Sequence, residues 1–259
     1  MNTYEYWIEQ GIEASARAAS TFHQEVEKLS ILDGFHRVEG ARRIISNAFI
    51  SGTGIEVGGG DRPFPIPGGA QVVYGDIRDS SALQKYFNNN DVPENGWIDA
   101  ETFETIREGS LDFIISAHVI EHLRNPFGSI LEGIRRLKVG GVYVIIVPDK
   151  RYTFDKNREP TSFDHLMSDL KTGGLDTMRE AYLDHIRYIH TLYHPAIPTE
   201  LEESEVDKIF NAKMDIHVHC WTRETFSEHV SRLLSDRGAK VVFESSVENE
   251  SSFVIRREW

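Results

Sequence analysis

The sequence contains a single cysteine, Cys220, so an intrachain disulfide is impossible and a reducing compartment is expected. It also lacks any apolar run near the roughly 20 residues that a membrane-spanning helix needs. Its first residues have neither the basic start nor the apolar stretch of a signal peptide. These absences predict a cytoplasmic protein that does not span a membrane.

Positive charge is also scarce: the formal net charge is −13, and Lys and Arg are not clustered. Proteins that bind nucleic acids neutralise phosphates with a stripe or patch of Lys and Arg. The densest basic groups are only pairs, such as Arg42-Arg43, Arg135-Arg136 and Arg256-Arg257. We therefore expect no nucleic-acid partner, and the acidic balance also argues against binding at a membrane surface.

The first part of the chain, residues 1–49, has the pattern of a helical cover. Apolar residues recur there at spacings of three and four, which places them on one helix face. They are Ile8, Ile12, Ala19, Phe22, Val26 and Leu29. Asp33-Gly34 interrupts the pattern, and a second helix is expected through 42–48.

Short apolar strands alternate with helical stretches over 50–149. Such alternation predicts a parallel sheet with helices on both faces. Strands are expected at 54–57, 70–76, 111–116 and 141–147, with a crossover helix over 125–137.

Residues 150–216 do not continue this rhythm and contain the breakers Gly173-Gly174, Pro195 and Pro198. We predict a mostly helical insertion there. The core resumes over 217–259, with a helix from Thr222 to Leu234 that uses Thr222 as N-cap. Two strands at 240–245 and 252–257 are expected to form an antiparallel hairpin at the sheet edge.

Acidic residues follow the strand ends in an ordered way. The first strand ends in Glu56-Val57-Gly58-Gly59-Gly60, where glycines let the backbone approach a ligand and a following helix N-terminus would favour negative charge. Asp76 closes the second strand 20 residues after Glu56, the spacing at which nucleotide-binding folds place an acid on ribose hydroxyls. Asp99 is a third acid, suited to accept a hydrogen bond from an adenine amino group. Together they predict a nucleoside-type cofactor.

Further blocks give this pattern a family resemblance. Ser116-Ala117-His118-Val119-Ile120-Glu121-His122-Leu123, Asn125-Pro126 and Leu137-Lys138-Val139-Gly140-Gly141 follow the glycine turn in order, before a strand that ends at Pro148. Over roughly residues 50 to 150 the chain resembles the class I (type 11) S-adenosylmethionine-dependent methyltransferases. The resemblance implies a Rossmann-like α/β fold whose last strand is antiparallel. Arg62-Pro63 departs from the family pattern, which predicts a differently shaped loop.

The resemblance also implies which residues hold S-adenosylmethionine. The methionine part is expected at Glu56, Gly58, Gly59 and Gly60, the ribose at Asp76 and Ile77, the adenine at Asp99 and Ala100, and the sulfonium at Ser116 and His118.

Two segments outside the cofactor blocks indicate which class of molecule accepts the methyl group. Residues 147–155 (Val-Pro-Asp-Lys-Arg-Tyr-Thr-Phe-Asp) and 217–222 (His-Val-His-Cys-Trp-Thr) resemble a bacterial subgroup associated with cell-surface polysaccharide genes. This implies a small-molecule acceptor such as a sugar or nucleotide sugar, methylated on a hydroxyl or amine, with O-methylation favoured. We expect the 150–216 insertion to bind that acceptor.

Methylation of a hydroxyl requires removal of a proton. Three candidate bases follow from their places at strand ends or beside the last helix: His118, His219 and Asp149. His217 and His219 alternate, so both are expected on one side of an extended segment.

The histidines of the insertion also raise the question of a metal. His190 and His194 are four residues apart, and His165 and His185 lie in the same segment. No compact His/carboxylate signature is present, so we predict no metal ligands.

Two other functions are compatible with the same blocks. One is a non-catalytic S-adenosylmethionine-binding or partner subunit, since binding and turnover are separate properties. The other is an NAD-dependent nucleotide-sugar oxidoreductase, because Tyr152 and Lys156 match a Tyr-x-x-x-Lys pair. The glycine turn lacks the G-x-G-x-x-G form expected of such an enzyme.

Overall fold

The computed structural model describes residues 18–31 and 36–259. The expected helical positions Ile8 and Ile12 and the break at Asp33-Gly34 lie outside the described residues. Residues 18–31 form a helix that buries Phe22 and Val26, whereas Ala19 is exposed. Helix α2 (Arg37–Phe49) follows.

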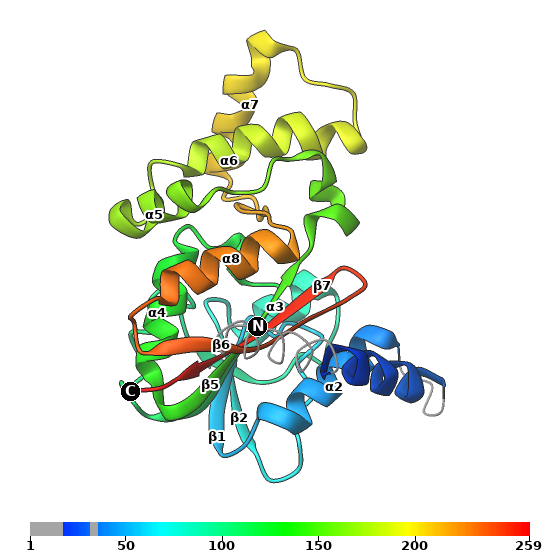
Figure 1. The fold of residues 1–259 in the computed structure, drawn as a ribbon. Helices are drawn as coiled ribbons and strands as arrows, with labels where there is room; N and C mark the ends of the chain where they lie inside the picture. The colour runs from blue at the N-terminus through cyan, green and yellow to red at the C-terminus, as the bar shows by residue number, and fades with distance from the viewer. Residues whose placement is uncertain (1–17, 32–35) are drawn as a thin grey trace, which may run out of the picture.

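A single seven-stranded sheet organises the chain, in the order β3-β2-β1-β4-β5-β7-β6 (Figure 1). Neighbouring strands from β3 to β5 are parallel, and β7 is antiparallel to both β5 and β6. The strands are β1 (Thr53–Val57), β2 (Gln71–Asp76), β3 (Asn95–Trp97), β4 (Leu111–Ala117), β5 (Leu137–Pro148), β6 (Ala239–Val247) and β7 (Glu250–Arg257). The Rossmann-like sheet with a reversed last strand is confirmed.

The C-terminal hairpin forms the expected antiparallel pair at the sheet edge. Strand β6 is the edge strand on this side, because β7 lies between β5 and β6. The turn consists of Glu248 and Asn249, and Val247 pairs with Glu250. Since Pro148 also pairs with Glu250, the hairpin brings this glutamate to the carboxyl end of β5.

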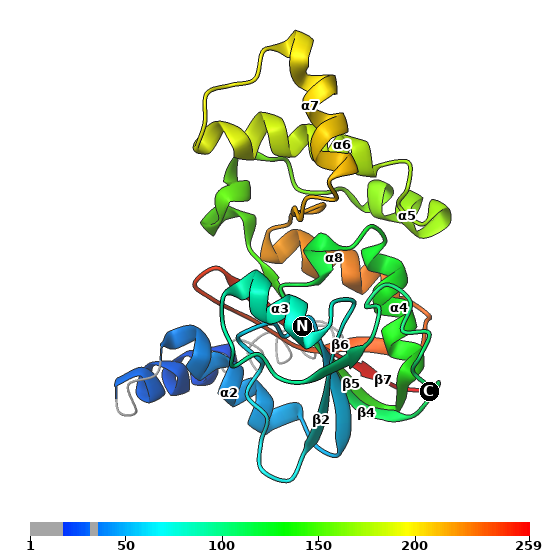
Figure 2. The same ribbon diagram turned by 180° about the vertical axis from the view of Figure 1, so that it is seen from behind.

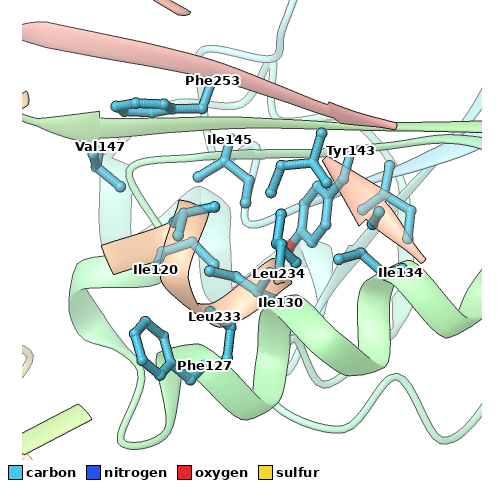
Figure 3. Close-up of a cluster of buried hydrophobic side chains, with 14 of the residues drawn as sticks. Ile120, Phe127, Ile130, Ile134, Tyr143, Ile145, Val147, Leu233, Leu234 and Phe253 are labelled. Atoms are coloured by element: carbon cyan, nitrogen blue, oxygen red, sulfur yellow. The ribbon is translucent and has the colours of Figure 1, made fainter. Parts of the chain in front are cut away.

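Helices α4 (Pro126–Arg136) and α8 (Arg223–Leu234) cover one face of the sheet. Strand β5 shows why this face is buried: Tyr143, Ile145 and Val147 pack among side chains of α4 and α8 (Figure 3). The residues of β5 that alternate with these three point to the opposite face of the sheet and belong to the hydrophobic cluster there. The predicted N-cap Thr222 is confirmed, since its side chain accepts the Thr225 amide hydrogen.

The opposite face corrects the expectation of a helix after the glycine turn. Residues 58–70, between β1 and β2, contain no helix. Pro63, Pro65 and Pro67 disfavour helical geometry in this connection. Phe64 is buried there together with Phe22, Val26, Ala41 and Ile45, so the N-terminal helices cover the area that a crossover helix would fill.

Residues 150–216 form a further helical layer, which both views show beyond α8 (Figures 1 and 2). Its helices are α5 (Phe163–Thr172), α6 (Met178–Asp184) and α7 (Thr199–Asn211). Short helical turns are η2 (Lys150–Tyr152), η3 (Phe154–Asn157), η4 (His185–Ile189) and η5 (His190–Leu192). The layer has a small core of its own, which includes Tyr182, Ile186, Val206 and Ile216. Among the described helices, none is long and apolar enough to cross a membrane.

Candidate active site

The glycine turn at the end of β1 needs glycine for two reasons. Gly58 and Gly60 have φ angles of +65° and +54°, a region that disfavours residues with a side chain. A Cβ atom on Gly58 would lie 2.5 Å from Val119 Cγ2, and one on Gly60 would lie 2.8 Å from the ring of Phe87. The turn therefore packs directly against side chains from the β4 end and from α3 (Ser80–Phe87).

Glu56 lies beneath this turn and is fully buried. Both of its carboxylate oxygens accept the Phe64 amide hydrogen, at 2.9 and 3.0 Å. Burial raises the pKa of Glu56 to about 7, although the hydrogen bond from Phe64 and the charge of Arg42 oppose the rise. The side chain thus fixes the loop that leaves the glycine turn.

Asp76 and Asp99 lie where the neighbouring parallel strands β2 and β3 end. Asp76 ends β2 and pairs with Trp97 of β3, two residues before Asp99. Asp76 accepts the Arg78 amide hydrogen at 2.8 Å, and burial raises its pKa. A carboxylate has about four acceptor positions, so capacity remains for hydroxyl groups.

The neighbouring cofactor candidates differ in exposure. Ile77 is 61% exposed beside Asp76. The Asp99 carboxylate accepts the Glu101 amide hydrogen at 2.8 Å, and the Ala100 carbonyl accepts the Ser129 hydroxyl at 2.6 Å. Ser116 is fully buried within β4, so its hydroxyl does not face open space.

His118 is held between two buried carboxylates. Its Nε2 atom lies 2.9 Å from Glu250 Oε1, and its Nδ1 atom lies 3.5 Å from Glu121 Oε1. Burial lowers the pKa of His118, but the hydrogen bonds and charges of Glu121 and Glu250 outweigh it and raise the pKa to about 9. The ring is therefore protonated near neutral pH and has no lone pair to accept a proton, which argues against the base role.

The other two expected bases are not placed to remove a proton either. His219 is fully buried and stacks on Trp221 with ring centroids 5.7 Å apart, and burial lowers its pKa to about 3. Asp149 is buried in an ion pair with Arg151 at 2.6 Å, on a cavity of about 750 Å³ that also includes Arg37 and Arg223. A base must reach the proton that it removes, and these two side chains are enclosed or paired.

A second cavity, of about 570 Å³, lies between the core and the helical layer. Asp215 joins the two parts, because it lies 3.2 Å from Arg78 after β2 and 3.0 Å from His122 after β4. His217 lines this cavity, and its Nδ1 atom lies 2.6 Å from Asp155 Oδ2. No described residue forms such a pair with the remaining ring nitrogen of His217, so His217 and Asp155 have the arrangement of an oriented base.

The sequence did not single out several residues of this arrangement. Asp155, Asp215 and Glu250 meet histidines that are 62, 93 and 132 positions away, respectively, so spacing gives no local signal. His217 and His219 are expected on one side of an extended segment, but they contact different groups, Asp155 and Asp169.

Part of the chain matches a known family of domains. Residues 56–145 match the family model described as "Methyltransferase domain". No curated protein matches the chain. Among solved structures, a methyltransferase from Aquifex aeolicus is similar with 14% identity and a TM-score of 0.44, over 89% of this chain and 97% of that one.

Two more solved structures are similar to this chain to about the same degree. A methyltransferase from Thermotoga maritima has 13% identity and a TM-score of 0.45, over 91% of this chain and 95% of that one. The CurJ carbon methyltransferase has 16% identity and a TM-score of 0.44, over 86% of this chain but only 53% of its own. By the family match, residues 56–145 are a methyltransferase domain, the part of the chain that carries β2 to β4 of the sheet described above.

Proposed function

We propose that this enzyme methylates a hydroxyl group of a small molecule, such as a sugar or nucleotide sugar, bound in the 570 Å³ cavity. The cavity is the observation that carries the proposal. Its volume lies within the range of about 300–1,000 Å³ typical of small-molecule sites. Its lining combines hydrogen-bonding groups with apolar walls, and includes His122, His217, Asp215, Ile186 and Ile189.

The cofactor residues fit S-adenosylmethionine, which supplies an electrophilic methyl group on a positively charged sulfur. Glu56 fixes the loop that leaves the glycine turn, and Gly58, Gly59 and Gly60 would carry the methionine part. Asp76 has spare acceptor capacity for ribose hydroxyls, and exposed Ile77 offers an apolar surface beside it. Asp99 and Ala100 would hold the adenine at the same edge.

His217 is the base that this geometry favours for the acceptor hydroxyl. Asp155 accepts from Nδ1, which fixes the tautomer and orientation and leaves Nε2 as the acceptor of the proton. His118, by contrast, carries a positive charge between Glu121 and Glu250 and would position the strand end beside the cofactor.

The alternatives have less support. The Tyr152–Lys156 pair lies in two separate short turns, η2 and η3, and Tyr152 is 67% exposed, so an oxidoreductase site is not favoured. A cofactor-binding subunit without turnover would need the same cofactor residues but no oriented base facing the cavity.

A direct test measures S-adenosylhomocysteine release with a panel of nucleotide sugars, free sugars, small acids and amines. We expect release with at least one hydroxyl acceptor, and loss of that release in His217→Gln with cofactor binding retained. Tight cofactor binding without release for any acceptor would instead support the non-catalytic binder. Release that is unchanged in His217→Gln would reject His217 as the base.

A further inference from the structure

A buried cluster of two histidines and a carboxylate lies away from the proposed acceptor cavity. His165 and Asp169 are one turn apart on α5, and His219 comes from the segment that leads into α8. His165 Nε2 lies 3.2 Å from Asp169 Oδ2, and His219 Nε2 lies 3.7 Å from the same oxygen. One ligand atom from each of the three lies within 4.8 Å of the others.

The burial of this cluster is not explained by hydrogen bonds. His219 and Asp169 are both 0% exposed. Asp169 Oδ2 and both ring nitrogens of His219 lack a partner with hydrogen-bond geometry. A buried polar group without a hydrogen bond costs about 1–3 kcal/mol, so Asp169 Oδ2 and His219 Nε2, which face each other at 3.7 Å, require a cause.

We propose that His165, Asp169 and His219 bind one divalent transition-metal ion, of which zinc is the best match. Zinc takes imidazole nitrogens and carboxylate oxygens at about 2.1 Å, which places tetrahedral ligand atoms about 3.4 Å apart. The separations of 3.2 and 3.7 Å bracket that value. The ion would bind two of the atoms that lack a hydrogen bond, Asp169 Oδ2 and His219 Nε2, together with His165 Nε2.

The surroundings of the cluster match those of a metal site. The Thr177 hydroxyl donates to the other oxygen of Asp169 at 2.6 Å, which orients the carboxylate. The His165 side chain is 30% exposed, which leaves one side open for entry of the ion and for a water ligand.

A metal here would have a structural role. The ion would join α5 of the helical layer to the segment 217–222 of the core, and so fix the layer over the sheet. It would stabilise the folded protein according to its concentration and affinity.

The second His/carboxylate cluster, Glu121, His122 and His217, does not carry the same argument. His122 contacts Asp215 at 3.0 Å, His217 contacts Asp155 at 2.6 Å, and Glu121 faces the charged His118. Each of these groups has a charge partner outside its cluster, whereas Asp169 Oδ2 contacts His165 and His219 of its own cluster.

The test uses the full-length protein, freed of any affinity tag and stripped with a chelator. Addition of Co²⁺ is expected to give the visible absorption of a four-coordinate site, saturating at one ion per chain, and Zn²⁺ is expected to displace it and raise the melting temperature. His165→Ala removes the most exposed ligand and is expected to weaken Co²⁺ binding at least tenfold.

His190 and His194 provide the matched control, because their rings lie 4.8 Å apart outside the cluster and could bind an ion at the surface. The double variant H190A/H194A is expected to keep the full Co²⁺ signal. Stoichiometric binding that survives in His165→Ala but disappears in H190A/H194A would overturn the proposal. So would a chelated wild-type protein whose melting temperature and spectrum do not respond to either ion.

Discussion

His118 Nε2 lies 2.9 Å from Glu250 Oε1, and this contact joins the end of β4 to the start of β7. The same glutamate accepts two hydrogen bonds from Arg42 of α2, at 2.6 and 3.1 Å. One buried carboxylate therefore links the N-terminal cover, the centre of the sheet and the C-terminal hairpin.

This relationship predicts a large effect for Glu250→Gln. The substitution leaves two cationic side chains facing a neutral amide in a buried site, and breaking such a pair costs about 3–5 kcal/mol. We expect urea unfolding to show a loss of about 3 kcal/mol. Glu39→Gln is the control, because the Glu39–Arg43 pair is exposed and contributes little. Equal losses in the two variants would contradict this role for Glu250.

Glu56 predicts a pH dependence of stability. Its pKa in the folded state is about 7, above the ordinary value of 4.5, so the folded protein holds a proton that the unfolded chain releases between these values. Its contribution to stability therefore falls as the pH rises through this window and is constant above it. Between pH 5 and pH 8 the fall amounts to about 2 kcal/mol.

Glu56→Gln tests this sign, since it keeps an oxygen for the Phe64 amide and removes the titration. Denaturant unfolding at pH 5 and pH 8 should show a pH-dependent loss about 2 kcal/mol smaller in the variant than in the wild type. A pH dependence identical in both proteins would show that Glu56 titrates normally.

Asp76→Ala is predicted to weaken S-adenosylmethionine binding at least tenfold while leaving the fold intact, because the ribose hydroxyls lose their acceptor. Asp91→Ala changes an exposed acid after α3 and serves as the control. Calorimetry measures both affinities. An affinity unchanged by Asp76→Ala would refute the ribose assignment.

The oriented base predicts a specific kinetic pattern. His217→Gln should lower kcat about 100-fold or more, with little change in the affinity for S-adenosylmethionine. His194→Ala changes another histidine of the same cavity that has no buried carboxylate partner, and should act mainly on the KM of the acceptor. A kcat reduced equally by both changes would mean that the cavity, rather than a base, had been disturbed.

The insertion is predicted to select the acceptor. A chimera in which residues 150–216 are exchanged for those of a relative should take on the acceptor preference of that relative. A chimera that retains the original preference would place selection in the core instead.

The sequence predicted best what depends on local pattern. The helix from Thr222 and the buried strand before Pro148 follow from capping and apolar periodicity, and both are present. The helix after the glycine turn was expected wrongly, although Pro63, Pro65 and Pro67 were a visible signal against it.

The protonation and burial of the histidines could not be predicted in the same way. His118 is charged because Glu250, 132 residues later, reaches it, and His219 is enclosed because α5 packs over it. Both effects arise only when distant segments meet, so the residue type and its position on a strand end left the base unassigned.

The central claim is that the methyl group is delivered into the 570 Å³ cavity beneath the helical layer. A crystal structure with S-adenosylhomocysteine tests it most directly. We predict the ribose on Asp76 and the sulfur directed toward His122 and His217. A sulfur directed instead toward the cavity lined by Arg37, Arg151 and Arg223 would contradict the account.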